Sequence, residues 1–345
     1  MSLLCSMLVL MFAGDCPPVP AQEKAPLPTS QQVRAAVERS LPFLLEGGEA
    51  WREGKTAGGQ NGRICVTCHQ IPFTIWSHNE AKMRGLTIDQ KRLDDLTAWS
   101  LDWCATQKHP KTQTHTGGFL STMQQLIMGR SASPPDRTAL ETYQLFGKVI
   151  GTMQKEEGSW KEGNQIKGKG TAREADEVDT MWIILGLSSL EKLDGLPRET
   201  LESSVKDRER GLQWLKTGQP GTRTDWLALR MLVEREYGAP EQTQEWLKQL
   251  LAQQNADGGW PLMKGEPSHP LVTGQCLYAL SIAGETSDSP AIGRATKYLV
   301  ETQEKDGSWK AVSRNNPAHT NVVTTYWGTG WATIGLIRTL PKKAG

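Results

Sequence analysis

A seven-residue pattern that occurs three times constrains this chain more than any other feature. Residues 154–160 (Q-K-E-E-G-S-W), 254–260 (Q-N-A-D-G-G-W) and 303–309 (Q-E-K-D-G-S-W) all fit Q-x-x-[DE]-G-[SG]-W, and each follows an amphipathic segment. The glycine predicts a helix stop, because glycine adopts the left-handed C′ conformation without a Cβ penalty. The tryptophan beyond it can fold back over the helix end and bury about 150–250 Å². The pattern therefore predicts a repeated structural staple and carries no catalytic group.

The spacing of the copies gives the size of the repeating unit. Trp160 and Trp260 are 100 residues apart and Trp260 and Trp309 are 49 apart, so the period is about 50 with one copy missing. A degenerate copy falls in the gap, at 210–226. A unit of this size predicts a helical hairpin. Twelve helical stretches are expected at about 31–50, 72–84, 88–107, 119–129, 136–154, 176–193, 198–216, 224–237, 241–254, 271–284, 290–303 and 321–339.

These stretches alternate in character. Segments 241–254 and 290–303 are amphipathic and suit an outer layer with one wet face, whereas 178–190, 271–283 and 322–340 are apolar nearly all round, as buried helices are. Twelve alternating helices make six hairpins, enough to close a ring. The fold class predicted is all-α.

The repeats carry a family resemblance. Basic/Gly–aromatic–Leu–Gln–Gly–Trp repeats of this kind resemble the QW motifs of squalene and hopene cyclases, well over about 135–340 and by helix count alone in the N-terminal third. The resemblance implies the α/α toroid that these enzymes share with protein prenyltransferase β subunits, an inner ring of helices inside an outer one. We expect a single toroid domain at 31–340, after a Pro-rich linker at 22–30.

Ring closure predicts where a site would lie. All inner helices run the same way, so their N-termini, each with a positive dipole end, gather at one rim. The expected rim segments are 65–69, 115–117, 176–179, 223–225, 273–276 and 319–320.

The N-terminus predicts export. Residues 3–13 form an apolar run too short to span a bilayer, and Val19-Pro20-Ala21 offers a small-residue cleavage site. We therefore expect a signal peptide at 1–21, a periplasmic or secreted protein and no transmembrane span. The net charge of +1 without a basic block argues against nucleic acid as a partner.

Cys65-Val66-Thr67-Cys68-His69 is the sharpest chemical motif. C-x-x-C-H is the attachment sequence for c-type haem, in which two thiols bond the porphyrin and the histidine ligates the iron. The chain also resembles exported bacterial cyclase-repeat proteins that carry C-x-x-C-H near the first hairpin. The alternatives are a Cys65–Cys68 disulfide beside an idle histidine, and a metal site that uses His69 with His78.

A sixth iron ligand would come from the neighbouring inner helices. His319 and His115 are equal candidates, Met123 follows them, and a vacant position is the alternative. His78 lies nine residues after His69, so a helical segment would carry it away from the same iron. For both rim histidines the structural alternative is a loop side chain that faces water.

Asp176-Glu177-Val178-Asp179-Thr180 lies where squalene-hopene cyclases carry D-x-D-D-T. In the resemblance, Asp176 and Asp179 match the flanking aspartates, and Val178 replaces the central one, which protonates the alkene or epoxide. A valine cannot deliver a proton, so cyclisation by protonation is not expected. Asp176 and Asp179 are the weak catalytic candidates, and their structural alternative is to complement a helix N-terminus.

Cys276 and His319 are similar to two of the three zinc ligands of prenyltransferase β subunits. The third, an aspartate two residues before the cysteine, is Gly274 here, so zinc is not expected.

Three hypotheses follow. The first is an exported toroid with covalent haem at the cavity rim, which serves a redox partner or binds a hydrophobic small molecule in an aromatic-lined cavity. The second is an isoprenoid cyclase relative without the usual proton donor, and the third is a non-enzymatic scaffold with a Cys65–Cys68 disulfide. Whether the protein is an enzyme stays open at this level.

Overall fold

The structure is a computed structural model that describes residues 26–55, 66, 70–106, 120–161, 170–313, 316–320 and 322–342. Twelve helices and one two-stranded hairpin form within these ranges. Their bounds are α1 Ser30–Arg52, α2 Ile71–Met83, α3 Gln90–Thr106, α4 Leu120–Met128, α5 Arg137–Thr152, α6 Ala172–Glu191, α7 Arg198–Leu215, α8 Thr224–Tyr237, α9 Pro240–Ala252, α10 Pro270–Ala283, α11 Pro290–Thr302, β1 Val312–Ser313, β2 Asn316–Thr320 and α12 Val322–Thr339. The predicted helices are confirmed in number and order; the hairpin was not predicted.

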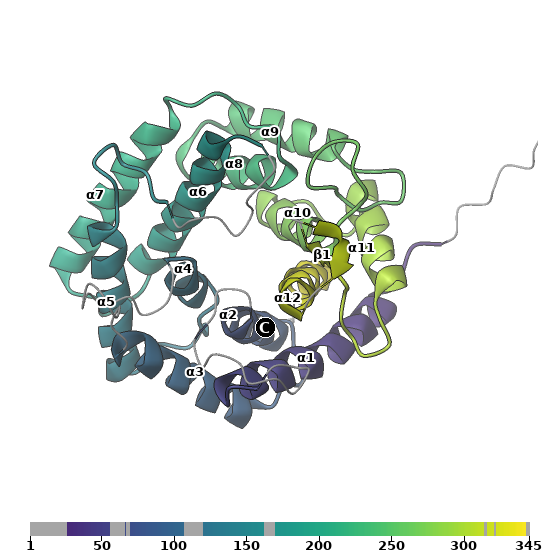
Figure 1. The fold of residues 1–345 in the computed structure, drawn as a ribbon, viewed down its shortest axis with the longest axis horizontal. Coiled ribbons are helices and arrows are strands. Elements are labelled where there is room, and N and C mark those ends of the chain that lie inside the picture. Colours follow the sequence, from purple (N-terminus) through teal and green to yellow (C-terminus); the bar gives the residue numbers. More distant parts are fainter. Residues whose placement is uncertain are drawn as a thin grey trace, which may run out of the picture.

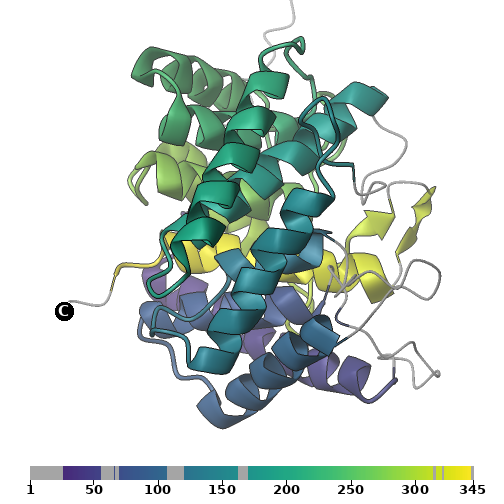
Figure 2. The same cartoon turned by 90° about the vertical axis from the view of Figure 1, so that its left-hand side faces the viewer.

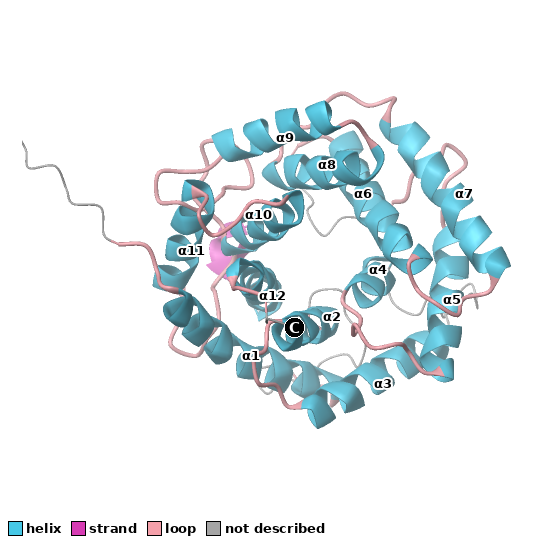
Figure 3. Cartoon of the chain, turned by 180° about the vertical axis from the view of Figure 1, so that it is seen from behind, coloured by secondary structure: helices cyan, strands magenta, loops and turns pink. Residues whose placement is uncertain are grey.

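The helices form two concentric rings (Figure 1). Odd-numbered helices make the outer ring and even-numbered helices the inner one, and the view from behind gives the same arrangement (Figure 3). Each inner helix packs on the next, and α12 packs on α2, so the ring is closed. The predicted α/α toroid is confirmed. None of the described helices has both the length and the apolar character that a bilayer-spanning segment needs.

Side-chain contacts between helix ends show that the inner helices are parallel. Their carboxyl ends are joined by Asn79 Nδ2 to Gly129 O (2.8 Å), Arg130 Nη2 to Ser189 O (3.0 Å), Lys192 Nζ to Glu236 Oε1 (2.5 Å) and Arg235 Nη1 to Ala283 O (3.2 Å). The amino ends therefore share the opposite rim, where the β1–β2 hairpin leads into α12 (Figure 2). We call this the N-terminal rim.

The three staples hold the two rings together. Each indole N–H donates to a carbonyl ten residues earlier, at 2.8 Å, and each tryptophan is at most 1% exposed. Each tryptophan backbone N–H donates to a threonine of the following inner helix, namely Thr180, Thr273 or Thr329. Each glutamine Nε2 donates at 2.8 Å to a carbonyl of the following outer helix, namely Asp207, Ala291 or Ala36. Each staple thus joins three helices. The staple at 303–309 joins α11 and α12 to α1.

The staple glycine is not the helix C′ residue that the sequence predicted. Gly158 has the expected positive φ of 104°, but α5 ends at Thr152, and the Gly158 N–H closes a turn onto Lys155 O at 2.9 Å. A Cβ at Gly158 would lie 2.6 Å from the carbonyl oxygen of Arg210. Glycine is therefore needed because the next outer helix approaches the turn closely.

Each repeat copy lies at a corner of the ring, where one helical hairpin meets the next. The corner formed by the degenerate copy at 210–226 is built from charged groups. The Arg173 guanidinium lies 3.5 Å above the Trp214 ring and pairs with Glu177 at 2.8 Å. Glu177, which is 2% exposed, also accepts a 2.7 Å hydrogen bond from Trp226 Nε1. An ion pair and a cation–π contact here take the place of the staple.

Candidate functional site

Val66, inside the C-x-x-C-H motif, and Gln70, directly after it, are held at the N-terminal rim. The Val66 carbonyl accepts a 3.3 Å hydrogen bond from Thr122 Oγ1 of α4, and Gln70 Nε2 donates to Gly47 O of α1 at 2.6 Å. Val66 and Gln70 are each 1% exposed. Cys65, Cys68 and His69 themselves, and His115, lie outside the described residues. The positions of Val66 and Gln70 therefore agree with a rim position for the motif.

The other candidate axial ligands come from elements beside α2 in the ring. His319 belongs to β2, whose Thr320 pairs with Val312, and its side chain is outside what the structure describes. Met123 lies on α4 and is 1% exposed. α12 and α4 both contact α2, the helix that follows the motif.

The acidic pair predicted on α6 is divided between two environments. Asp176 pairs with Lys161 at 3.3 Å and keeps a 20% exposed side chain. Asp179 lines a small cavity at the centre of the ring. Val178 is 5% exposed and buried in the helix packing. The carboxylate that reaches the central cavity is thus that of Asp179.

That cavity has a volume of about 30 Å³, which holds one or two water molecules. Aromatic rings pack together next to this cavity. Trp331 contacts Trp182 (5.3 Å between ring centroids), Trp76 (5.4 Å) and Tyr278 (5.7 Å). Around the cavity stand Ser121, Gln124, Gln125, Asp179, Trp182, Ile183, Gln275, Trp327 and Trp331. Ligand pockets usually measure about 300–1,000 Å³, so the cavity that these described residues line is well below that size.

The cavity wall is polar as well as aromatic. Gln125 and Gln275 are 5% and 6% exposed, and among the described residues their Oε1 atoms find no hydrogen-bond donor. Buried amides of this kind usually bind a partner or ordered water. A water-sized polar species is what this arrangement can hold.

A buried charged cluster supports the wall beside Asp179. Arg223 is 0% exposed and donates to the Asp225 carboxylate at 2.9 and 2.5 Å. Glu174 Oε1 accepts the backbone N–H groups of Thr222 (2.6 Å) and Arg223 (2.7 Å). Burial alone would lower the pKa of Arg223, but Asp225, Glu174 and Asp179 outweigh burial and raise it. The guanidinium therefore stays charged inside the protein.

Arg223 and Asp225 were predicted at the rim, whereas Glu174 was not. α6 begins at Ala172, four residues before the predicted start, because Thr171 caps the Glu174 N–H at 3.1 Å. The signal was present as Thr171-Ala172-Arg173-Glu174, a capping-box sequence.

A zinc site at Cys276 lacks space for its third ligand. A Cβ at Gly274 would lie 2.2 Å from the Trp331 carbonyl oxygen, because α10 and α12 meet backbone to backbone at this point. Cys276 is a free, fully buried thiol. Burial first, and then the charge of Asp225, raise its pKa well above the ordinary value. The thiol is therefore a packing group.

Part of the chain matches a known family in sequence. Residues 219–298 match the Squalene-hopene cyclase N-terminal domain. Drimenyl diphosphate synthase from Streptomyces showdoensis is 38% identical over 65 residues, which are 19% of this chain and 12% of that protein.

Several solved structures share the fold over almost their whole length. A glycosidase variant gives a TM-score of 0.62 at 10% identity and covers 90% of this chain and 98% of its own. A variant of the type II terpene cyclase MstE from Scytonema, in complex with geranylgeranyl dihydroxybenzoate, gives 0.53 at 13% identity over 90% and 98%. A possible GH105 member from Salmonella enterica gives 0.53 at 15% identity over 96% and 99%. Together with the partial family match, these likenesses describe a terpene-cyclase-like α/α toroid.

Proposed function

We propose that this terpene-cyclase-like toroid is an exported protein that carries a covalent c-type haem at its N-terminal rim. Cys65 and Cys68 would hold the porphyrin, and His69 would ligate the iron. The observation that carries the proposal is the anchoring of Val66, inside the motif, against α4 and of Gln70, directly after it, against α1. When bound, the haem would supply one-electron chemistry. The protein's residues would hold the haem and supply ligands to its iron.

The ring suits this role by rigidity. Thr74 Oγ1 donates to Leu44 O at 2.9 Å, one turn into α2, so the helix that follows the motif is pinned to α1. A fixed α2 start would hold the His69 imidazole in one orientation, which is how a protein tunes an axial ligand. The sixth position would be filled from His319 or His115, or from Met123, or left open to a small molecule.

Protonation-initiated cyclisation is disfavoured by two features of the ring centre. Val178 occupies the position of the usual acid, and the cavity of about 30 Å³ that the described residues line at the ring centre is far smaller than an isoprenoid needs. A redox role at the rim requires neither an acid nor a large cavity.

The mass of the purified mature protein is the deciding measurement. After export in a host that attaches c-type haem, we expect a mass increase equal to one haem, with a red product. The Cys65→Ala, Cys68→Ala double variant is the control and should be colourless at the unmodified mass. A colourless wild-type protein whose mass shows a Cys65–Cys68 disulfide would refute the haem and favour the scaffold.

The family match at 219–298 supports a second candidate, an isoprenoid-binding or isoprenoid-converting protein. Incubation with squalene and analysis of the lipid extract tests it. We expect no cyclic product, and a cyclic product from the wild type would reverse the order of the two proposals.

A further inference from the structure

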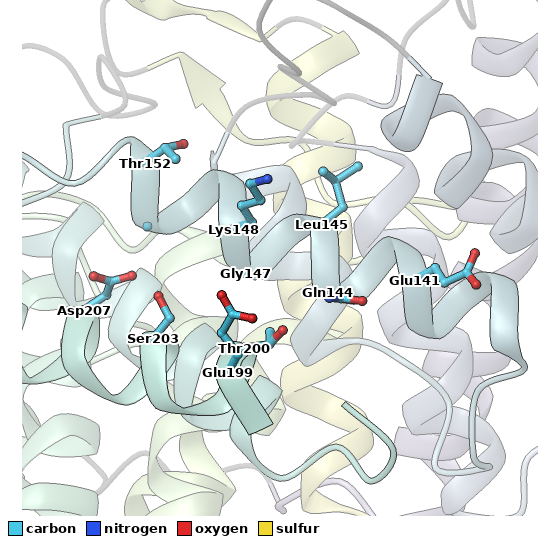
Figure 4. Close-up of a pocket in the computed structure, with 11 residues that line it drawn as sticks. Glu141, Gln144, Leu145, Gly147, Lys148, Thr152, Glu199, Thr200, Ser203 and Asp207 are labelled. Carbon is cyan, nitrogen blue, oxygen red and sulfur yellow. The ribbon is translucent and has the colours of Figure 1, made fainter. Parts of the chain in front are cut away.

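A groove on the outer ring lies away from the rim site. It runs between α5 and α7, has a volume of about 640 Å³ and falls within the size range of small-molecule sites (Figure 4). Its walls are Glu141, Gln144, Leu145, Gly147, Lys148, Gly151 and Thr152 on α5 and Glu199, Thr200, Ser203 and Asp207 on α7.

The repeat corner that carries the groove departs from the other two on its first helix. Three residues before the staple glutamine, α9 has Leu251 and α11 has Val300, but α5 has Gly151. One helical turn earlier, Leu247 of α9 corresponds to Gly147 of α5. Both glycines line the groove, so neither position places a side chain in it.

The second helix of the same corner departs in a complementary way. The staple glutamines donate to the backbone carbonyls of Asp207, Ala291 and Ala36, so these three residues are structurally equivalent. The carboxylate at this corner thus stands where the other two have a methyl group. A Cβ at Gly151 would lie 2.3 Å from Asp207 Oδ2, so the carboxylate occupies the space that the missing side chain leaves.

The Asp207 carboxylate has no hydrogen-bond donor among the described residues. Its residue is 9% exposed, and its carboxylate accepts no hydrogen bond from the described part of the chain. Burial raises the pKa of Asp207 against the opposing charges of Arg210 and Lys206. A buried carboxylate that lines an open groove is completed by a ligand that brings both N–H donors and positive charge.

A second carboxylate stands on the same helix face. Glu199, Ser203 and Asp207 follow each other at four-residue spacing along the α7 wall (Figure 4). Glu199 and Asp207 are eight residues apart, which is about 12 Å along a helix. The lining has three carboxylates, those of Glu141, Glu199 and Asp207, and the positive charge of Lys148 offsets one of their negative charges. Leu145 is an apolar residue on the α5 wall.

We propose that this groove binds a linear aliphatic polyamine, with one ammonium group on Asp207 and another at Glu199. The excess of carboxylates over lysine in the lining and the spacing of about 12 Å between Glu199 and Asp207 along α7 match that chemistry. The proposal does not depend on haem at the rim.

Isothermal titration calorimetry with spermidine tests the site on the purified full chain. We expect saturable binding of one spermidine, and Asp207→Asn and Glu199→Gln should each weaken it by about tenfold or more. Glu241→Gln, at an exposed site on α9, should leave the affinity unchanged. Butylamine, with one ammonium group, should bind more weakly than spermidine.

The chain supplies its own packing control. The double variant Gly151→Leu, Asp207→Ala recreates the Leu251–Ala291 pair of the α9–α11 corner, so it should fold with an unchanged urea midpoint and lose spermidine binding. Absence of saturable binding in the wild type would overturn the proposal. Unchanged binding in the double variant, or equal weakening by Glu241→Gln, would do the same.

Discussion

His78 shows how the toroid controls the charge of a single residue. It lies on α2, is 2% exposed and donates from Nδ1 to Thr74 O at 2.7 Å. Burial lowers its pKa to about 4, against the opposing effect of the Thr74 hydrogen bond. The side chain is therefore a neutral packing group at pH 7, and the metal site with His69 that the sequence left open would have to break this hydrogen bond or use Nε2.

This burial predicts a dependence of stability on pH. Between pH 6.5 and pH 4 the unfolded chain protonates its histidine while the folded chain does not, so the free energy of unfolding falls as pH falls through this window. The loss assigned to His78 is about 3 kcal/mol at most. Urea unfolding at pH 7.0, 5.5 and 4.5 measures it, and His78→Gln should flatten that part of the profile. An identical slope in the variant would show that other groups cause it.

The residues of the central cavity were only partly predictable. Asp179 was assigned to the rim because it falls near the start of an apolar helix, and that inference needs only the period of the repeat. The packing of Trp331 against Trp76 at the ring centre was not predictable, because it depends on the close approach of α10 and α12 at Gly274. Helix count and polarity say nothing about how one inner helix is rotated against the next.

At the scale of elements, the staples were predictable and the fourth corner was not. Tryptophan, glutamine and glycine recur at fixed spacing, so three copies define one geometry. The corner near Trp214 has lost that pattern, and its Arg173–Glu177 pair reads in sequence like any exposed i,i+4 pair. Only the structure shows that Glu177 is buried beneath it and also holds Trp226.

This contrast predicts unequal effects from two similar ion pairs. Arg173→Gln removes the guanidinium from the Trp214 ring and leaves the buried Glu177 with the Trp226 hydrogen bond alone, so we expect a loss of about 1–3 kcal/mol in the free energy of unfolding. Arg198→Gln is the control, because its partner Glu202 is 62% exposed. That variant should lie within about 0.5 kcal/mol of the wild type. Equal midpoints in urea for the two variants would contradict the structural role assigned to Arg173.

At the scale of the molecule, the ring is closed by contacts between the first and last helices. Gln303 Nε2 donates to Ala36 O at 2.8 Å, and Thr333 Oγ1 donates to Ser40 Oγ at 2.8 Å. At the carboxyl ends of α2 and α12, the Arg84 guanidinium donates to the carbonyl of Leu340. A linear array of hairpins can lose its terminal repeats first, because each repeat contacts only its neighbours. In a closed ring each hairpin has two neighbours, so α1 is no weaker an end than α9.

Closure therefore predicts one cooperative transition and equal sensitivity at two sites that differ in sequence separation. Gln303→Ala removes a bond that spans 267 residues, and Gln254→Ala removes its equivalent, which spans 37. Each should lower the free energy of unfolding by about 1–3 kcal/mol, with helix content and tryptophan fluorescence changing at the same urea concentration. An early transition in the Gln303→Ala variant alone, with loss of only part of the helix signal, would mean that α1 detaches independently and that the ring behaves as an open row of hairpins.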